Sequence, residues 1–110
     1  MALTHVIFDL CAMPEYIEPL RFEALSALAE DNGEWKLSTI KKLRRLDSFL
    51  KESQRVNQST FLGFDRKVTS PVKLSDGETI LPRGASIVIP GGPISRNSLF
   101  YENPQQFDGF

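Results

Sequence analysis

The chain has one cysteine, Cys11, and one histidine, His5, among its 110 residues. A single cysteine excludes an internal disulfide, and the paired Cys and His spacing of a structural zinc site is absent. We expect Cys11 to be a small buried residue on a helix and His5 to be a partly exposed helical residue. There is no nucleotide-binding glycine loop and no hydrolase triad pattern, and Gly91-Gly92 between two prolines is typical of a turn. The sequence therefore predicts neither catalytic nor metal-ligating residues.

An excess of charge of either sign is also absent, because the formal net charge is −1. Without a basic stripe, nucleic acid is not an expected partner. The densest basic cluster fits a solvated helix face, with a partner or lipid surface as the alternative; its members are Lys41, Lys42, Arg44 and Arg45. The apolar run 6–12 is far too short to span a membrane and lacks the basic flank of a secretory signal. We expect an intracellular chain with no anchor or signal peptide in this sequence; its compartment is not indicated.

Helical periodicity dominates the first half of the chain. Apolar residues from Leu3 to Leu10 recur at helical spacing and predict a helix. Pro14 is suited to begin a second helix, whereas an internal Pro19 costs roughly 3 kcal/mol and predicts a kink or a start after it. That helix should end at residues 31–33, where Gly33 can adopt a left-handed conformation. A short helical turn from Leu37 and an amphipathic helix over 46–56 should follow.

The second half has the character of strands and turns. Asp76-Gly77 between two short apolar runs predicts a hairpin, and Pro90 to Pro93 should break the strand that precedes them. Ser95 is expected to cap a helical turn that reaches Tyr101. The predicted strands are 61–68, 72–74, 79–81 and 86–89. The fold class is therefore α+β, with helices first, then a small antiparallel β-sheet and a short helical turn.

Glu52 and Arg55 lie three residues apart, so they face the same side of the predicted helix. On spacing alone they form an exposed ion pair worth about 0.2–0.5 kcal/mol. The whole stretch 46–55, followed by the apolar segment 61–89 and by 103–110, resembles the cytochrome P-450 family of heme-thiolate monooxygenases, with 46–55 as its K helix. The resemblance implies that Glu52 and Arg55 are a buried structural motif. It also implies a second arginine partner beyond the Phe107–Phe110 stretch.

Arg66 taken alone is a solvent-exposed arginine at a strand edge. In the resembled family an arginine at this place binds a heme propionate, a role that suits a guanidinium because it meets a carboxylate with two parallel hydrogen bonds. The resemblance also implies that 57–64 lines a substrate pocket. The sequence departs from the family there, since Asn57-Gln58-Ser59 stands where Asn-Pro-Pro is usual.

The resemblance covers nearly the whole chain. Residues 7–11 and 14–21 are similar to the filamentous-fungal branch that oxidises terpenoid and indole-type secondary metabolites. A full-length member binds heme b, whose iron is held by a cysteine, takes electrons from a reductase and oxidises an apolar small molecule. That cysteine lies beyond the last matched stretch. Residues 1–110 are therefore expected to be a partial domain of the C-terminal half, truncated before the heme-ligand loop.

Two functional hypotheses remain open. In the first, the chain is part of a monooxygenase, binds no heme alone and is inactive alone. Apolar faces that pack against the rest of the family fold would then favour self-association. In the second, it is a small non-enzymatic binding or interaction protein derived from a monooxygenase gene.

Overall fold

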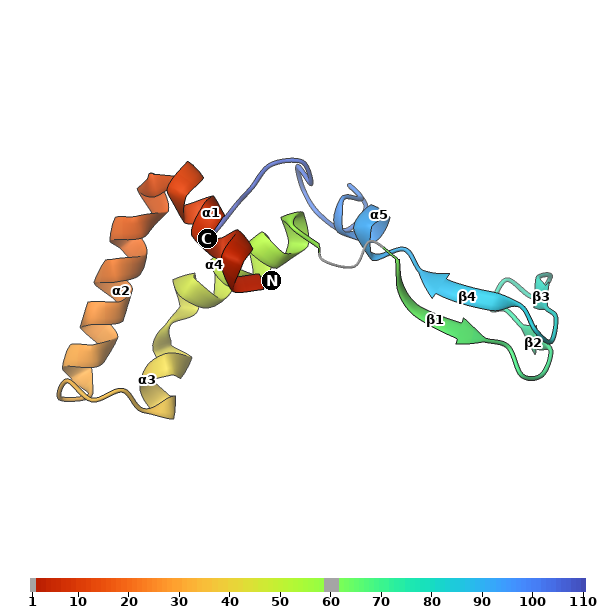
Figure 1. The fold of residues 1–110 in the computed structure, drawn as a ribbon, viewed down its shortest axis with the longest axis horizontal. Coiled ribbons are helices and arrows are strands. Elements are labelled where there is room, and N and C mark those ends of the chain that lie inside the picture. The colour runs from red at the N-terminus through yellow and green to blue at the C-terminus, as the bar shows by residue number, and fades with distance from the viewer. Residues whose placement is uncertain (1, 59–61) are drawn as a thin grey trace. The chain divides into compact units, whose positions relative to one another are not determined.

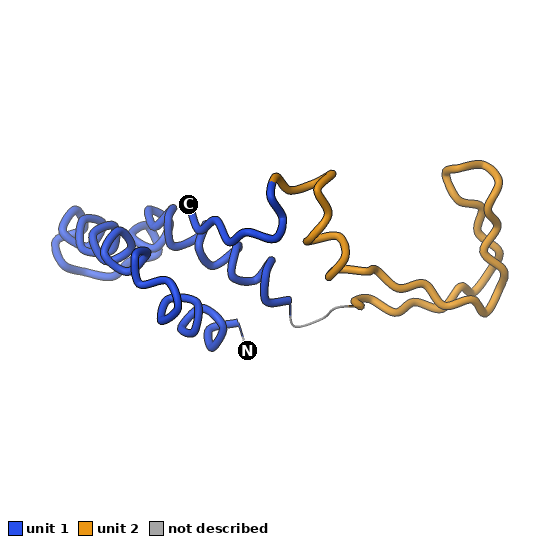
Figure 2. The backbone as a smooth tube through the Cα atoms, turned by 90° about the horizontal axis from the view of Figure 1, so that it is seen from above, with its two compact units in different colours: residues 1–59, 103–110 blue, residues 60–102 orange. Residues whose placement is uncertain are grey.

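The computed structural model describes residues 2–58 and 62–110, which form two compact units (Figures 1 and 2). The first unit consists of residues 2–58 and 103–110, and the second of residues 62–102. The first unit contains α1 (Ala2–Ala12), the 3-10 helix η1 (Pro14–Tyr16), α2 (Ile17–Glu30), α3 (Leu37–Lys42) and α4 (Arg44–Val56). The second contains β1 (Gly63–Lys67), β2 (Val72–Lys73), β3 (Ile80–Leu81), β4 (Ser86–Ile89) and α5 (Gly91–Ser95).

Helix α4 is the centre of the first unit and packs against α1 and α2. Its inner face carries Phe49 and Ser53, which are both fully buried. On its exposed side, Lys51 Nζ lies 2.7 Å from Asp47 Oδ2, one helical turn away. This division into a buried and a charged face follows from the 3.6-residue period of the sequence.

The start of α4 is stabilised from another helix. The Glu23 carboxylate of α2 accepts hydrogen bonds from the backbone N–H groups of Arg45, at 2.8 Å, and Leu46, at 3.0 Å. Both amides belong to the first helical turn, where backbone N–H groups have no partner inside the helix. A carboxylate there also opposes the positive end of the helix dipole. Glu23 therefore fixes α2 and α4 to each other at this end.

The prolines of the second predicted helix act differently from the expectation. Pro14 begins η1 rather than an α-helix, and α2 runs without a break from Ile17. Pro19 is thus the third residue of α2, where its missing N–H would have had no intrahelical acceptor. The expected kink, or a start after Pro19, was wrong. The end of the helix was predicted correctly, since Gly33 has a φ of +78° and donates its N–H to Leu28 O at 2.9 Å.

A buried threonine joins α2 to α3. The Thr39 side chain is fully buried, and its hydroxyl donates to the Asp31 carboxylate. Lys42 Nζ lies 3.0 Å from both Asp31 Oδ1 and Glu30 Oε2. The hydrogen bond from Thr39, followed by that from Lys42, holds the pKa of Asp31 below its ordinary value.

The second unit consists of two antiparallel strand pairs, β1 with β4 and β2 with β3. A β-bulge lies between Gly63 and Arg66, where Phe64 has a φ of +54°. The predicted hairpin is present, with Gly77 at a φ of +75°. Asp76 accepts the N–H groups of Glu78 and Thr79 and the Thr79 hydroxyl, and these hydrogen bonds lower its pKa. Of the predicted first strand, residue 61 lies outside the described residues.

The predicted turn that reaches Tyr101 is present, with the Tyr101 N–H donating to Asn97 O at 3.1 Å, but its cap is Asn97 rather than Ser95: Asn97 Oδ1 accepts the Leu99 N–H at 2.9 Å. A short helix, α5, occupies residues 91–95, so Pro90–Pro93 does not simply break the chain. Ser95 is the last helical residue, and its hydroxyl donates to Gly92 O at 3.0 Å. Pro93 is the third residue of α5, in the first turn where proline is tolerated.

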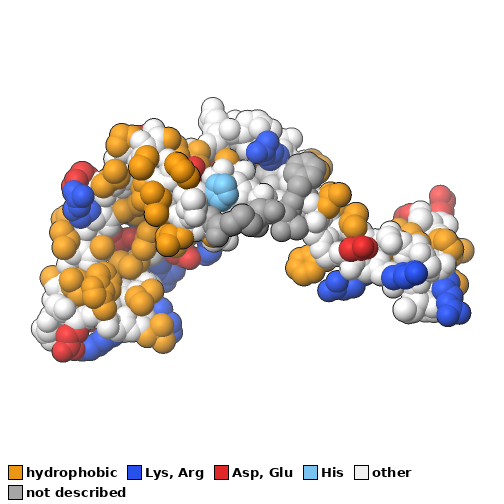
Figure 3. Space-filling model, in the orientation of Figure 1, with side chains coloured by type: hydrophobic (Ala, Val, Ile, Leu, Met, Phe, Trp, Pro, Cys, Tyr) orange, Lys and Arg blue, Asp and Glu red, His pale blue; other side chains and the backbone are white. Residues whose placement is uncertain are grey.

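The buried apolar core is small for a chain of this length. In the described part of the chain it consists of Val6, Ala27, Leu43, Phe49 and Val68. Many large apolar side chains are exposed, and several gather over the helices of the first unit (Figure 3). None of the helices in residues 2–58 and 62–110 has the length and apolar character needed to cross a membrane. The α+β class, with helices before antiparallel strands, is confirmed.

Candidate functional site

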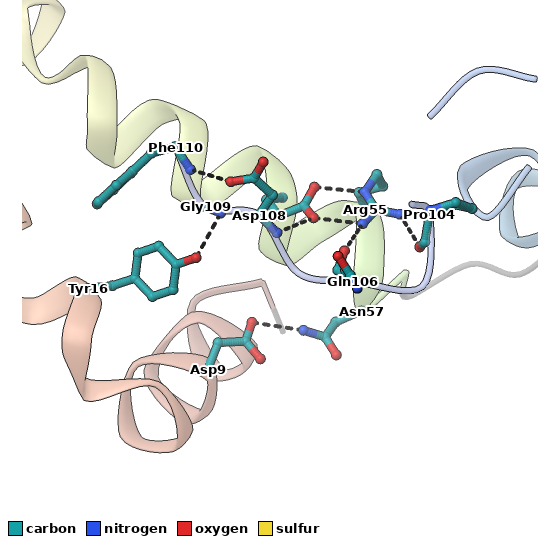
Figure 4. A network of polar contacts seen from close by, with 10 residues as sticks. Asp9, Tyr16, Arg55, Asn57, Pro104, Gln106, Asp108, Gly109 and Phe110 are labelled. Carbon is teal, nitrogen blue, oxygen red and sulfur yellow. Dashed lines mark hydrogen bonds and ion pairs between the residues drawn. The ribbon is translucent and has the colours of Figure 1, made fainter. Parts of the chain in front are cut away.

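The Glu52–Arg55 site is an ion pair on the last two turns of α4 (Figure 4). Arg55 Nε donates to Glu52 Oε2 at 2.7 Å, and Arg55 Nη2 donates to Glu52 Oε1 at 2.6 Å. The pair is therefore bidentate, the geometry in which a guanidinium binds a carboxylate most strongly. The pairing expected from the three-residue spacing is present.

The same two side chains bind the C-terminal segment 103–110. Arg55 Nη1 donates to Pro104 O at 2.8 Å, and Arg55 Nη2 donates to Gln106 O at 2.9 Å. In return, the Asp108 backbone N–H donates to Glu52 Oε1 at 2.9 Å. Because these three partners are backbone groups, the ion pair recognises the path of the chain at 104, 106 and 108.

Burial separates this pair from an ordinary surface ion pair. The Arg55 side chain is 9% exposed and the Glu52 side chain 14%. By comparison, Lys51 and Asp47 on the same helix are 74% and 59% exposed. The hydrogen bond from Arg55 lowers the pKa of Glu52; the Asp108 N–H adds to this, while burial opposes it. Glu52 is thus held as a carboxylate and serves as an acceptor.

An aromatic cluster holds the far end of the C-terminal segment. Tyr16, at the end of η1, has its ring centroid 5.2 Å from that of Phe49, 5.8 Å from Phe107 and 5.0 Å from Phe110. The Gly109 N–H donates to the Tyr16 hydroxyl oxygen at 3.3 Å (Figure 4). Gly109 is buried, and a Cβ atom there would lie 2.7 Å from Tyr16 and 2.8 Å from Phe49. Only glycine fits this position without displacing a ring.

A second polar contact joins α1 to the end of α4. Asp9 Oδ2 accepts a hydrogen bond from the Ser53 hydroxyl at 2.6 Å. It accepts another from Asn57 Nδ2 at 2.9 Å (Figure 4). Ser53 is fully buried, so its hydroxyl cannot donate to water and depends on Asp9 as its acceptor. Neither this contact nor the role of Tyr16 was predicted from the sequence.

Arg66 belongs to the second unit, where it is exposed on β1. Its Nη1 donates to Asp65 O at 2.9 Å, and its Cζ lies 5.8 Å from the ring centroid of Phe64. Glu52 and Arg55 lie in the first unit. The heme-propionate role of Arg66 remains a prediction.

Cys11 and His5, the one thiol and the one imidazole of the chain, both lie on α1. Cys11 is exposed on α1, which corrects the expectation that it is buried. The side chain points to solvent because the helix buries Val6 instead. His5 is partly exposed, as expected. Within residues 2–58 and 62–110, no three His, Cys, Asp or Glu side chains are grouped so that they could hold a metal ion.

Helices followed by antiparallel strands, with a Glu–Arg ion pair on the last long helix before the strands, fit the part of the cytochrome P-450 fold that the sequence resembles. Comparison with known proteins agrees. The sequence profile of the family Cytochrome P-450 matches residues 1–109, and the chain belongs to this family. The resemblance seen in the sequence is thereby confirmed.

Relatives that match the whole chain come from filamentous fungi. Cytochrome P-450 monooxygenase AN1598 of Emericella nidulans is 47% identical over 110 residues, and the match covers 20% of that protein. Cytochrome P-450 monooxygenase olcJ of Penicillium canescens is 44% identical over 110 residues, again 20% of its length. Ent-kaurene oxidase of Gibberella intermedia is 44% identical over 113 residues, 21% of its length. The chain spans about a fifth of the length of the curated relatives it matches.

Proposed function

We propose that this chain is a scaffold segment of a heme-dependent monooxygenase that oxidises an apolar secondary metabolite. The observation that carries the proposal is the largely buried Glu52–Arg55 pair, which binds the backbone of residues 104–108. Family membership supports heme b as the cofactor and a reductase as the electron donor of the whole protein. A relative named Ent-kaurene oxidase supports an apolar substrate.

In this proposal Glu52 and Arg55 have a structural role. Both side chains are nearly buried, and the described contacts bind them to each other and to backbone groups. Neither is available to exchange a proton with a substrate, since the carboxylate is held ionised by the guanidinium. Their contribution is to fix the segment 103–110 on α4.

Arg66 is the residue proposed to meet the cofactor. Its guanidinium is exposed, and the contact it makes to Asp65 O uses only one of its donors, Nη1. A guanidinium has five N–H donors in a planar fork that matches a carboxylate such as a heme propionate. When bound in the whole protein, heme supplies the oxygen chemistry.

For the isolated chain we propose no monooxygenase activity and a tendency to self-associate. Its one thiol is solvent-exposed, and its large apolar side chains are exposed over several helices. Purified chain mixed with heme, reduced and exposed to carbon monoxide is expected to lack the strongly red-shifted Soret band of a thiolate ligand. That band, if present and abolished by Cys11→Ser, would contradict this part of the proposal.

A chimera tests the scaffold role directly. Residues 1–110 replace the matching 110 residues of the Emericella nidulans relative. We expect the chimera to take up heme and show the thiolate-type Soret band. Arg55→Ala should abolish heme uptake, whereas Lys51→Ala, which removes the exposed pair on the same helix, should not. A soluble chimera in which both variants retain heme equally would refute the role.

The same chimera tests Arg66. Arg66→Ala is expected to speed the loss of heme to a competing apoprotein, with partial recovery in Arg66→Lys, which keeps the charge but loses the bidentate geometry. Arg83→Ala is the matched control, because Arg83 is another exposed arginine of the second unit. Equal rates of heme loss for Arg66→Ala and Arg83→Ala would exclude the propionate contact.

A further inference from the structure

Residues 69–71 form an exposed connection between β1 and β2. The chain is held on both sides: the buried Val68 donates its N–H to Ala85 O at 2.8 Å, and Val72 pairs with Leu81. Between these points, Thr69 and Ser70 make no hydrogen bond to another described residue, through backbone or hydroxyl. This short segment can therefore enter a binding groove without breaking a hydrogen bond of the unit.

Ser70-Pro71 is the only place in the sequence where a serine or threonine precedes a proline. The proline ring disfavours the helical conformation at Ser70 and so favours an extended backbone there. Pro71 also has no N–H, so a groove that accepts it need offer no acceptor. Lys73, three residues after Ser70, is exposed and places a positive charge close to Ser70 along the chain.

We propose that Ser70 is a phosphorylation site for an ATP-dependent, proline-directed serine/threonine kinase that favours a basic residue three positions after the serine. The Ser70 Oγ attacks the γ-phosphorus of Mg-ATP. An Oγ–P bond forms, the bond from the γ-phosphorus to the β–γ bridging oxygen breaks, and ADP leaves. The hydroxyl proton passes to the catalytic carboxylate of the kinase. The proposal is independent of the heme-related function.

The modification would change the charge of the second unit. Residues 62–102 include five basic and four acidic side chains. A phosphoserine carries about −1.5 to −2 charge at neutral pH, so a single phosphate reverses the sign of the net charge. The effect is concentrated on an exposed loop, with Lys67 and Lys73 equally far along the chain on either side.

The test uses the full chain, ATP and a proline-directed kinase of that specificity, with the product mapped by mass spectrometry. We expect one phosphate on Ser70, complete loss in Ser70→Ala and loss of most incorporation in Pro71→Ala. Ser75→Ala is the matched control, an exposed serine of the same unit that precedes Asp76, and should be phosphorylated like the parent chain. Circular dichroism of each variant establishes that the fold is unchanged.

Two results would overturn the proposal. One is phosphate on Thr69 or on another serine in place of Ser70. The other is phosphorylation of a synthetic peptide of residues 66–75 but not of the full chain, because the fold would then block a motif that the peptide presents.

Discussion

Arg55 combines an ion pair with recognition of a distant backbone segment. Its guanidinium pairs with Glu52 and also donates to the carbonyls of Pro104 and Gln106. Removing a charge from water is costly, and the cost is offset only when the remaining donors are also satisfied. The five N–H groups of a guanidinium can donate to a carboxylate and to two carbonyls at once. A lysine ammonium cannot match the bidentate geometry of the carboxylate contact.

Arg55→Ala is expected to destabilise the chain by about 3–5 kcal/mol, because it leaves the largely buried Glu52 carboxylate without its cation. Arg55→Lys should recover only part of this, since the contacts to the carboxylate and to the two carbonyls need the fork. Lys51→Ala should cost at most about 1 kcal/mol, because its pair with Asp47 is exposed. Chemical denaturation of the chimera gives the values. Equal losses for the Arg55 and Lys51 variants would contradict the buried-pair interpretation.

The lowered pKa of Glu52 predicts a pH dependence with a definite sign. A carboxyl whose pKa is lower in the folded state binds its proton more weakly there than in the unfolded state. Its stabilising contribution is therefore fully present above its usual pKa of 4.5 and is lost as the pH falls through the lowered value. The amide hydrogen of Asp108, which donates to Glu52, should exchange faster over that window.

Two other carboxyls, Asp31 and Asp76, also have lowered pKa values. Their protonation in acid therefore also lowers the stability of the fold. Glu52→Gln isolates the site: the stability difference from the parent chain should be large near neutral pH and shrink in acid. Asp47→Asn, on the exposed face of α4, is the control and should show a small difference throughout. A Glu52→Gln difference that does not change with pH would rule out the ionised carboxylate as its source.

The sequence could predict the Glu52–Arg55 pair but not what the pair binds. Two residues three apart on a helix must share a face, so their contact follows from helix geometry alone. The partners at 104, 106 and 108 are backbone groups, and a carbonyl or amide is present at nearly every position of any chain. Backbone partners cannot be recognised from residue type, so they are known only from the folded path of the chain.

At the scale of elements, the segment 103–110 is held at both ends by different forces. Hydrogen bonds to Arg55 and Glu52 fix its first part. The aromatic cluster of Tyr16 and Phe49 fixes its last part, with Phe107 and Phe110 contributed by the segment itself. Arg45 of α4 adds a cation–π contact, with its Cζ 5.5 Å from the Phe110 ring centroid. A segment without regular secondary structure is thereby given a defined position.

Gly109→Ala is expected to release the last part of this segment. The added Cβ would lie 2.7 Å from Tyr16 and 2.8 Å from Phe49, and Phe49 is fully buried and cannot move aside freely. Overpacking of this kind typically costs 1–3 kcal/mol. The contribution of Tyr16 to the near-ultraviolet circular dichroism should weaken together with the stability. Gln105→Ala, at an exposed position of the same segment, should leave both unchanged; an unchanged signal in Gly109→Ala would disprove the close packing.

Asp9→Ala should loosen α1 from α4. It removes the acceptor of the buried Ser53 hydroxyl and of the Asn57 amide, and an unsatisfied buried group costs about 1–3 kcal/mol. Asp9→Asn, which keeps an acceptor oxygen, should cost less. A double-mutant cycle with Asn57→Ala is expected to be non-additive, because both changes remove the same hydrogen bond, that from Asn57 Nδ2 to Asp9 Oδ2. Additive free energies of unfolding would show that the contact contributes nothing.

The type and order of the elements were predictable, and the errors at this scale share one cause. Pro19 and Pro93 each occupy the third position of a helix, where the missing N–H has no cost inside the helix. A proline at such a position looks the same in sequence as one that breaks a helix. The hairpin was predicted because Asp76-Gly77 leaves few alternatives: Gly77 supplies the positive φ and Asp76 the acceptor.

At the scale of the whole molecule, two compact units and a small core leave much apolar surface in water. On α1 alone, Leu3, Ile7 and Phe8 are 68%, 54% and 68% exposed, whereas Val6 is the buried residue of that helix. An apolar face of this kind is unusual for a soluble monomer. The matched relatives are about five times as long as this chain, which accords with such faces packing against further parts of the family fold.

The isolated chain is therefore expected to self-associate, and its thermal unfolding should be broad. Burial of exposed apolar area stabilises a complex by roughly 25 cal/mol per Å² before the entropy of association is subtracted. In sedimentation velocity the mean mass should rise with protein concentration. Phe8→Lys should reduce the association because it places a charge in the apolar face, whereas Thr4→Lys, at an exposed polar position of the same helix, should have less effect. A monomer at every concentration, with a sharp cooperative thermal transition, would show that the units are stable without such a partner.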